Sequence, residues 1–201
     1  MISLSKLALI VFYLIADLYA VSILNDLGPN YDVVFYKFEQ CDKRGKVDFL
    51  SNLKVGKLNR THHIYTGIMD TGADVDNKLK VQVIAAVKSS SGRYSTLIDM
   101  KLKACDMVMT FGRDIFQSLA DNCNETLVCP KKRTRCDLKD FIINFNFNNL
   151  PVMPYGDYRV EVILLKMLPY AMEEKISCLM VFGGVVKRQS NPRSKNKKNM
   201  N

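Results

Sequence analysis

The residues that best match a catalytic pattern are Asp70, Thr71 and Gly72, which follow one another in the chain. An Asp-Thr-Gly segment can supply one half of a carboxylate dyad, in which two like charges lie so close that one carboxyl stays protonated. The same tripeptide is typical of a turn after a strand, because Asp hydrogen-bonds nearby backbone amides and Gly adopts positive φ. We interpret it as a turn and expect no enzyme.

Two further groups of residues have side chains that metal ions prefer. His62 and His63 have no Cys or carboxylate partner at metal-ligand spacing. Asp70, Asp74 and Asp76 lack the alternating ligands, central Gly and closing Glu of an EF-hand loop. The chain also has no Gly-x-Ser-x-Gly elbow and no phosphate-binding loop. We therefore expect no metal site and no cofactor.

The beginning of the chain has the pattern of a signal peptide. Lys6 precedes an apolar run over residues 7–16, and the small residues Ala20 and Ser22 suit a cleavage site. The run is shorter than the roughly 20 apolar residues that a membrane span needs, and no later run approaches that length. We expect residues 1–22 to be removed, and the protein to be secreted and extracellular, with no transmembrane segment.

Cysteine usage agrees with an oxidising compartment, where paired thiols form disulfides. We expect three disulfides from the six cysteines, which are Cys41, Cys105, Cys123, Cys129, Cys136 and Cys178. We predict that Cys41 pairs with Cys178, because closing so long a loop restricts the unfolded chain most, by about 4 to 5 kcal/mol. The other four are expected to attach a helix and its loop to the sheets, in a pairing that the sequence leaves open.

Two Asn-x-Thr sequons follow the leader, at Asn59 and Asn124. Neither has Pro in the middle position, so both fit the acceptor pattern for N-glycosylation. We expect each to lie on an exposed loop of a glycoprotein.

Most of the formal charge of +9 belongs to the end of the chain. Residues 187–201 hold six basic residues and no acid, so they have little to bury and are expected to be a disordered basic tail. The body between the leader and the tail, residues 23–186, is expected to be one domain. Because its own excess charge is small, we do not expect it to bind nucleic acid.

Apolar and polar residues alternate with a period of two along most of the body, which indicates strands with one face in a core. One stretch, 105–121, has helical spacing instead, although Gly112 interrupts it. The expected strands are 31–38, 47–55, 63–69, 79–87, 94–102, 141–147, 158–165 and 176–186. Seven or eight strands and one short helix predict an all-β protein, an antiparallel, immunoglobulin-like β-sandwich stapled by disulfides.

Several short motifs occur in an order that resembles a known family. They are Phe38-Glu39-Gln40-Cys41, Asn59-Arg60-Thr61, Asp74-Val75-Asp76-Asn77, Cys105-Asp106, Cys129-Pro130 and the Leu150-Pro151-x-Met153-Pro154-x-Gly156-x-Tyr158-Arg159 block. This ordered set resembles the insect secreted chemosensory CheA/CheB-type proteins, the CheA branch more closely, within the ML-like lipid-recognition group that includes the ganglioside activator. The resemblance implies a cup-shaped β-sandwich whose sheets part to admit a lipid or another hydrophobic molecule. It implies no catalytic residue.

By this resemblance, ligand contacts are spread over inward-facing apolar positions. In this sequence they would be drawn from Val81, Val83, Ile98, Met100, Phe141, Ile143, Phe145, Val160, Val162 and Leu164. Methionine-rich linings also suit surfaces that must refit around a guest.

Three functions follow as hypotheses. The first is a secreted protein that binds a lipid or pheromone-like ligand and acts in sensory perception of chemical stimuli, with a sensory receptor or ion channel as a partner. The second is a secreted adhesion or receptor-accessory module with a solid core. The third is an aspartic protease that uses Asp70.

Overall fold

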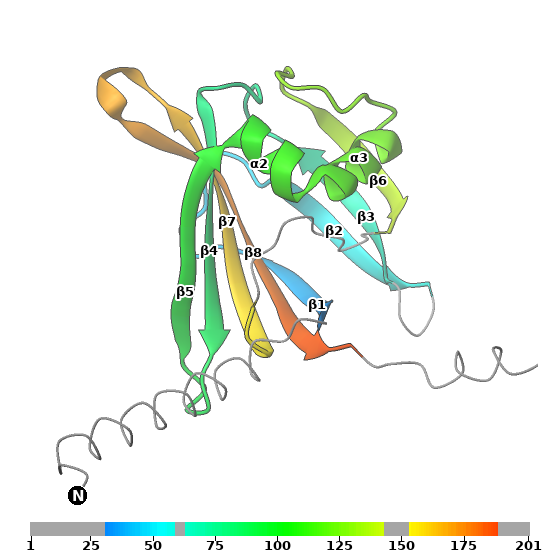
Figure 1. Cartoon of the computed structure of the whole chain (residues 1–201). Helices are drawn as coiled ribbons and strands as arrows, with labels where there is room; N and C mark the ends of the chain where they lie inside the picture. Colours follow the sequence, from blue (N-terminus) through cyan, green and yellow to red (C-terminus); the bar gives the residue numbers. More distant parts are fainter. Residues whose placement is uncertain (1–30, 59–62, 143–152, 189–201) are drawn as a thin grey trace, which may run out of the picture.

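The computed structural model describes residues 31–58, 63–142 and 153–188 (Figure 1). Within these residues eight strands form two antiparallel sheets, one ordered β1-β8-β7-β4-β5 and the other β2-β3-β6. The strands are β1 Tyr31–Gln40, β2 Leu50–Lys57, β3 His63–Asp70, β4 Leu79–Lys88, β5 Tyr94–Lys103, β6 Arg135–Phe141, β7 Gly156–Met167 and β8 Glu173–Lys187. The predicted all-β antiparallel sandwich is confirmed.

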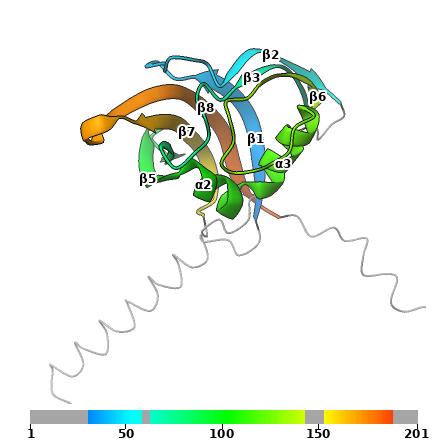
Figure 2. The same cartoon turned by 90° about the horizontal axis from the view of Figure 1, so that it is seen from above.

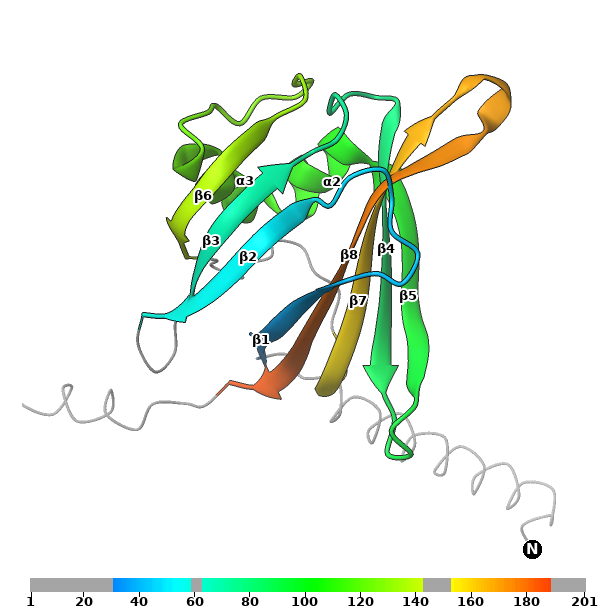
Figure 3. The same ribbon diagram turned by 180° about the vertical axis from the view of Figure 1, so that it is seen from behind.

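The two sheets face one another and share a core (Figure 3). Tyr65 and Met69 of β3, Leu138 and Phe141 of β6, and Leu179 of β8 are buried together in one cluster. Because Leu179 belongs to the five-stranded sheet and the others to the three-stranded sheet, this cluster joins the two layers. Burial raises the pKa of the Tyr65 hydroxyl to about 12, so the side chain stays neutral inside the core.

The segment expected to be one helix forms two. α2 spans Ala104–Phe111 and α3 spans Arg113–Asn122, and they meet at Gly112, whose φ of −124° is not helical. A Cβ at Gly112 would lie 2.9 Å from the ring of Phe116, so the close approach of that ring favours glycine here. α2 contacts β4 and β5, and α3 contacts β6, so the pair of helices connects one sheet to the other (Figure 2).

The three expected disulfides are present. Cys41 bonds to Cys178, as predicted, and so joins the residue after β1 to β8. The two pairings that the sequence left open are Cys105 with Cys129 and Cys123 with Cys136. The first anchors α2, and the second ties the end of α3 to β6, so these four cysteines attach the helices as expected.

Several strand boundaries differ from expectation. β2 begins at Leu50 where a strand from 47 was expected, and β1, β7 and β8 are longer than expected. β6 begins at Arg135, well before the strand expected at 141–147, and it ends at Phe141. The remainder of that expected strand, from residue 143 on, lies outside the described residues. β8 continues to Lys187, and the Arg188 side chain donates a hydrogen bond to Asp32 at 2.8 Å, so the ordered sheet extends just beyond the expected domain end at 186.

The expected signal peptide, the Asn59 sequon and the remainder of the basic tail all fall outside the described residues. Asn124 is described, and it is exposed directly after α3. Among the residues that the structure describes, no helix is long and apolar enough to cross a membrane.

Candidate ligand-binding face

One face of the five-stranded sheet carries a continuous apolar surface, which we call the inner face. In antiparallel sheets, residues paired directly across strands share a face. Three adjoining rows of paired residues run across β8, β7, β4 and β5. They are Val181, Val160, Ala85 and Ile98; then Leu179, Val162, Val83 and Met100; then Ser177, Leu164, Val81 and Leu102.

The inner face is the one that faces the second sheet and α2. Leu179 and Val181 belong to, or pack against, the core cluster that contains Tyr65 of β3. Further along the sheet, Val162 packs against the same buried cluster as Met107 of α2. Alternation along the strands therefore directs these rows into the sandwich.

The structure places seven of the ten predicted ligand-contact residues in these rows. They are Val81, Val83, Ile98, Met100, Val160, Val162 and Leu164. Phe141 is not in these rows: it is the last residue of β6, in the three-stranded sheet, and is buried in the core cluster that Leu179 also joins. Ile143 and Phe145 lie outside the described residues. The seven residues therefore share one face, and their role in binding stays a prediction.

The middle of the inner face is not closed off from solvent. Val160, Val162 and Leu164 lie on β7, the central strand of the sheet, and all three are partly exposed. Ile163, which points to the opposite face of the same strand, is buried. A solidly packed sandwich buries the inward side chains of its central strand most deeply. These three side chains are instead more exposed than Ile163 and Leu165 on the opposite face, and of the inward side chains of β7 it is Tyr158, nearer the start of the strand, that is buried.

Two buried polar atoms lie at one end of the inner face. The Ser177 hydroxyl and the Gln40 side-chain oxygen have no hydrogen-bond partner among the described residues. Ser177 is paired with Leu164, and Gln40 is paired with Leu179, which places both beside the apolar rows. The Gln40 amide nitrogen donates to the Leu50 carbonyl at 2.7 Å, so only its oxygen lacks a partner.

The Asp70-Thr71-Gly72 segment forms the turn that its composition predicts. The Gly72 N–H donates to Asp70 Oδ1 at 2.8 Å, and Gly72 has a φ of 69°. The Arg133 guanidinium donates to both carboxylate oxygens of Asp70, Nε to Oδ1 at 2.9 Å and Nη2 to Oδ2 at 2.5 Å. These hydrogen bonds, with that from Gly72, lower the pKa of Asp70.

An acid of a proteolytic dyad must instead share a proton with a second carboxyl. The partners of Asp70 among the described residues are all donors, so the geometry gives the protease hypothesis no support. The sequence alone did not indicate that Arg133 is the partner of Asp70, because the two residues lie far apart along the chain. The basic run at residues 131–133 was the only available signal.

The other two aspartates of the group considered above as metal ligands, Asp74 and Asp76, also accept hydrogen bonds from the protein. The Arg133 backbone N–H and the Lys132 ammonium donate to Asp74, at 2.9 and 3.0 Å, and lower the pKa of its carboxyl. Asp76 accepts a hydrogen bond from the backbone N–H of Lys78 at 2.8 Å. Asp74 therefore joins this loop to the segment that holds Lys132 and Arg133, while Asp76 makes a local turn.

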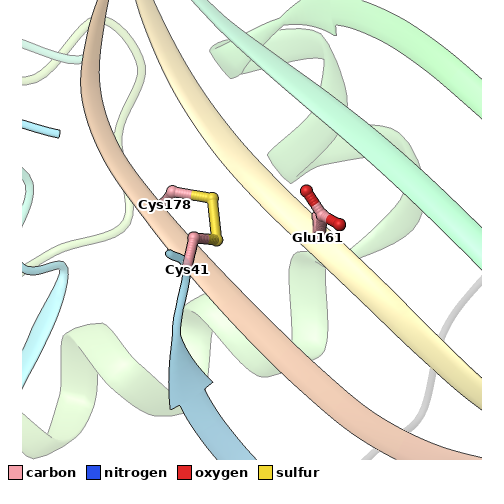
Figure 4. Close-up of side chains that lie close together, drawn as sticks. All are labelled: Cys41, Glu161 and Cys178. Atoms are coloured by element: carbon pink, nitrogen blue, oxygen red, sulfur yellow. A yellow bond between two sulfur atoms is a disulfide. The ribbon is translucent and has the colours of Figure 1, made fainter. Parts of the chain in front are cut away.

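One group of potential metal ligands occurs within the described part of the chain, formed by Cys41, Glu161 and Cys178 (Figure 4). Their ligand atoms lie within 4.8 Å of one another. The two sulfurs are bonded to each other, however, and metal ions bind the thiolate form of cysteine. Glu161 also faces Arg159, with Oε1 3.7 Å from Nη2. This group is therefore a disulfide beside a carboxylate.

Comparison with known proteins adds one family match. Residues 81–160 match a DUF1091 domain, described as a protein of unknown function. This family comprises insect proteins that resemble the ML-like fold. No curated protein is significantly similar to the chain in sequence. The DUF1091 segment runs from Val81 in β4 to Val160 in β7, so it includes both helices, two of the disulfides and much of the inner face.

Proposed function

We propose that this protein is a secreted binding protein for a hydrophobic ligand, a lipid or pheromone-like molecule, and that it acts in the perception of chemical stimuli. The observation that carries the proposal is the partial exposure of Val160, Val162 and Leu164 on the central strand. Apolar surface that stays in contact with water gains about 25 cal/mol for every Å² that a guest covers. A ligand with a flexible apolar chain that lies along the inner face would be stabilised by covering this surface.

The surroundings of the inner face fit the same function. Met100 lies within the rows and Met107 lies on the adjoining helix α2. Their thioether side chains are flexible and polarisable, which suits a surface that adapts to a guest. The unpartnered Ser177 hydroxyl and Gln40 oxygen add the small number of polar groups that orient a ligand in an otherwise apolar site.

Further features of the sequence and the structure support secretion and a chemosensory role. The three disulfides are typical of proteins that fold in an oxidising compartment. The leader pattern and the exposed Asn124 sequon agree with a secreted glycoprotein. The resemblance to CheA-type proteins supports a chemosensory role with a receptor or ion channel as the partner that receives the ligand. The DUF1091 match, to a domain of unknown function, agrees with the ML-like fold alone.

A pair of neighbouring substitutions tests whether the inner face binds the ligand. Val83 lies in the inner rows, whereas Ile84, the next residue of β4, packs on the opposite face. Both side chains are partly exposed. Val83→Phe fills space above the inner face, and Ile84→Phe adds the same ring on the other side of the same strand.

The measurement is displacement of a fluorescent fatty-acid probe, combined with native mass spectrometry of the gently purified protein. We expect co-purified lipid in the wild type and a loss of probe affinity of about tenfold or more in Val83→Phe only. If the wild type carries no lipid and binds no probe, the proposal is wrong and a solid-core adhesion module is the better hypothesis. Equal losses in both variants would show that the inner face is not the binding surface.

A further inference from the structure

The connection between β7 and β8 is an apolar hairpin tip, residues 168–172, with the sequence Leu-Pro-Tyr-Ala-Met. The strands pair as far as Met167 with Glu173, and the Leu168 N–H donates to the Met172 carbonyl at 2.9 Å. The neighbouring strand β4 ends its pairing earlier, where Leu79 lies opposite Lys166. The hairpin tip therefore projects beyond the rest of the sheet, as all three views of the chain show (Figures 1, 2 and 3).

The side chains of the hairpin tip are unusually exposed for their type. Tyr170 is 96% exposed and Met172 is 56% exposed, and Pro169 and Ala171 are exposed as well. No charged residue interrupts the five. Single exposed apolar residues are common on protein surfaces, but a contiguous apolar projection indicates a contact surface.

The backbone of the hairpin tip is held in a conformation that its residues disfavour. Tyr170 and Ala171 have φ values of 60° and 57°, in the left-handed region that glycine or asparagine normally occupies. A glycine at either position would relieve the strain but would remove an apolar side chain. Strained backbone of this kind concentrates in segments that make functional contacts.

Lysine side chains surround the base of the hairpin, and we call them the lysine collar. Glu173 pairs with both Lys80, at 3.5 Å, and Lys101, at 2.6 Å, and the Lys101 hydrogen bond is the main cause of its lowered pKa. Glu174 pairs with Lys46 at 2.6 Å. The collar consists of Lys43, Lys46, Lys80, Lys101, Lys166 and Lys175.

The lysine collar carries more positive charge than its acidic neighbours offset, which are Glu173, Glu174 and Asp74, the last through its interaction with Lys166. Lys175 donates to the backbone carbonyl of Lys43 at 3.4 Å, which brings the loop that carries Lys43 to the base of the hairpin. Lys166 is exposed and lies opposite Glu174 in the strand pairing. An apolar projection surrounded by an excess of cations is complementary to a surface that is apolar inside and anionic at its rim.

We propose that the hairpin tip inserts into the interfacial layer of an anionic lipid bilayer, with the lysine collar against the headgroup phosphates. Tyrosine prefers that layer because its ring is apolar and its hydroxyl is polar. Lysine ammonium groups near an anionic surface add electrostatic attraction that salt weakens. This contact does not depend on ligand binding at the inner face, so either proposal can fail without the other.

The absence of tryptophan from the sequence makes a direct test available. Tyr170→Trp places a single tryptophan at the hairpin tip of the oxidised protein. Val55→Trp is the matched control, because Val55 is 57% exposed on β2 of the other sheet. Both proteins are mixed with vesicles of phosphatidylcholine alone and of phosphatidylcholine with phosphatidylserine, and tryptophan emission and quenching by brominated lipid are recorded.

We expect a blue shift and quenching for Tyr170→Trp with the phosphatidylserine vesicles, reduced by salt, and neither effect for Val55→Trp. In the sedimentation of vesicles, the double variant Tyr170→Ser with Met172→Ser should bind about tenfold more weakly than the wild type. Unchanged emission of Tyr170→Trp overturns the proposal, including when the basic tail alone carries the protein to vesicles. A blue shift that appears without vesicles and depends on protein concentration also overturns it, because it assigns the hairpin tip to a second copy of the chain.

Discussion

Arg133 contacts both carboxylate oxygens of Asp70, and this pair closes the end of β3 onto the segment that leads into β6. The Asp70 side chain is only 10% exposed, whereas that of Arg133 is 49% exposed, so the carboxylate is the buried partner. The pair gives the Asp-Thr-Gly segment a structural role that can be measured.

Asp70→Asn should destabilise the protein at neutral pH by about 1 to 3 kcal/mol, because a charge-assisted hydrogen-bond pair is lost in a buried place. The folded pKa of Asp70 is lowered, so the contribution is complete above the unfolded pKa of about 4 and is lost as the pH falls through the folded value. Urea unfolding at neutral and acidic pH measures this, and the difference between variant and wild type should shrink in acid.

Asp76→Asn is the control for this prediction, since Asp76 accepts one backbone hydrogen bond and asparagine keeps an acceptor there. A difference for Asp70→Asn that stays constant down to strongly acidic pH would contradict the role of its charge.

Gly72 and Gly92 both have positive φ, 69° and 80°, but only one is crowded. A Cβ at Gly72 would lie 2.4 Å from a Val47 methyl and 2.6 Å from an Ile176 methyl, while nothing lies within 4 Å at Gly92. Gly92→Ala should therefore cost about 1 kcal/mol, from backbone strain alone, and Gly72→Ala about 2 kcal/mol or more. Thermal unfolding of the two variants measures the difference, and equal costs would refute the crowding.

The disulfides should differ in how much each contributes to the free energy of unfolding. The Cys41–Cys178 bond closes a separation of 137 residues and the Cys123–Cys136 bond one of 13. Replacing both cysteines of a pair with alanine should cost about 5 kcal/mol for the long loop and about 3 kcal/mol for the short one, by the chain-entropy estimate. Guanidinium unfolding of the two double variants gives the comparison. A larger loss for the short loop would show that local packing outweighs chain entropy.

Removal of two buried hydroxyls should change the free energy of unfolding in different ways. The Tyr158 hydroxyl donates to the Pro154 carbonyl at 2.8 Å, whereas the Ser177 hydroxyl has no partner among the described residues. Tyr158→Phe should cost about 1 kcal/mol, while Ser177→Ala should leave the free energy of unfolding unchanged or raise it by up to about 1 kcal/mol. A clear destabilisation by Ser177→Ala, measured by urea unfolding, would reveal a hydrogen bond to that hydroxyl.

Strand positions followed from the sequence wherever alternation was regular. β4 illustrates this, because its apolar residues from Leu79 to Val87 recur with a period of two and one side packs into the sandwich. β6 was missed because its exposed side carries charges, Arg135, Asp137 and Lys139, and only Leu138 and Phe141 are buried. A strand with so few buried side chains gives little periodic signal.

Alternation in the sequence indicated which residues share a face, but it did not indicate the contacts between distant segments or the exposure of loop residues. Alternation places side chains on a face, so seven of the ten predicted contact residues share the inner face although the strand pairing was unknown. Long-range pairs such as Asp70 with Arg133 depend on which strands become neighbours, and spacing does not encode that. The exposure of Tyr170 was also beyond prediction, because an apolar loop residue is buried or exposed according to what packs over it.

The three disulfides also differ in when they become available during synthesis. Both short-range bonds have all their sulfurs available once residue 136 has been synthesised. Cys41 is the first of the six cysteines to be synthesised, and its partner Cys178 is the last. The other four cysteines are made between them. Since chains emerge from the amino end, Cys41 must either stay reduced until Cys178 has been made or form an early bond that is exchanged later.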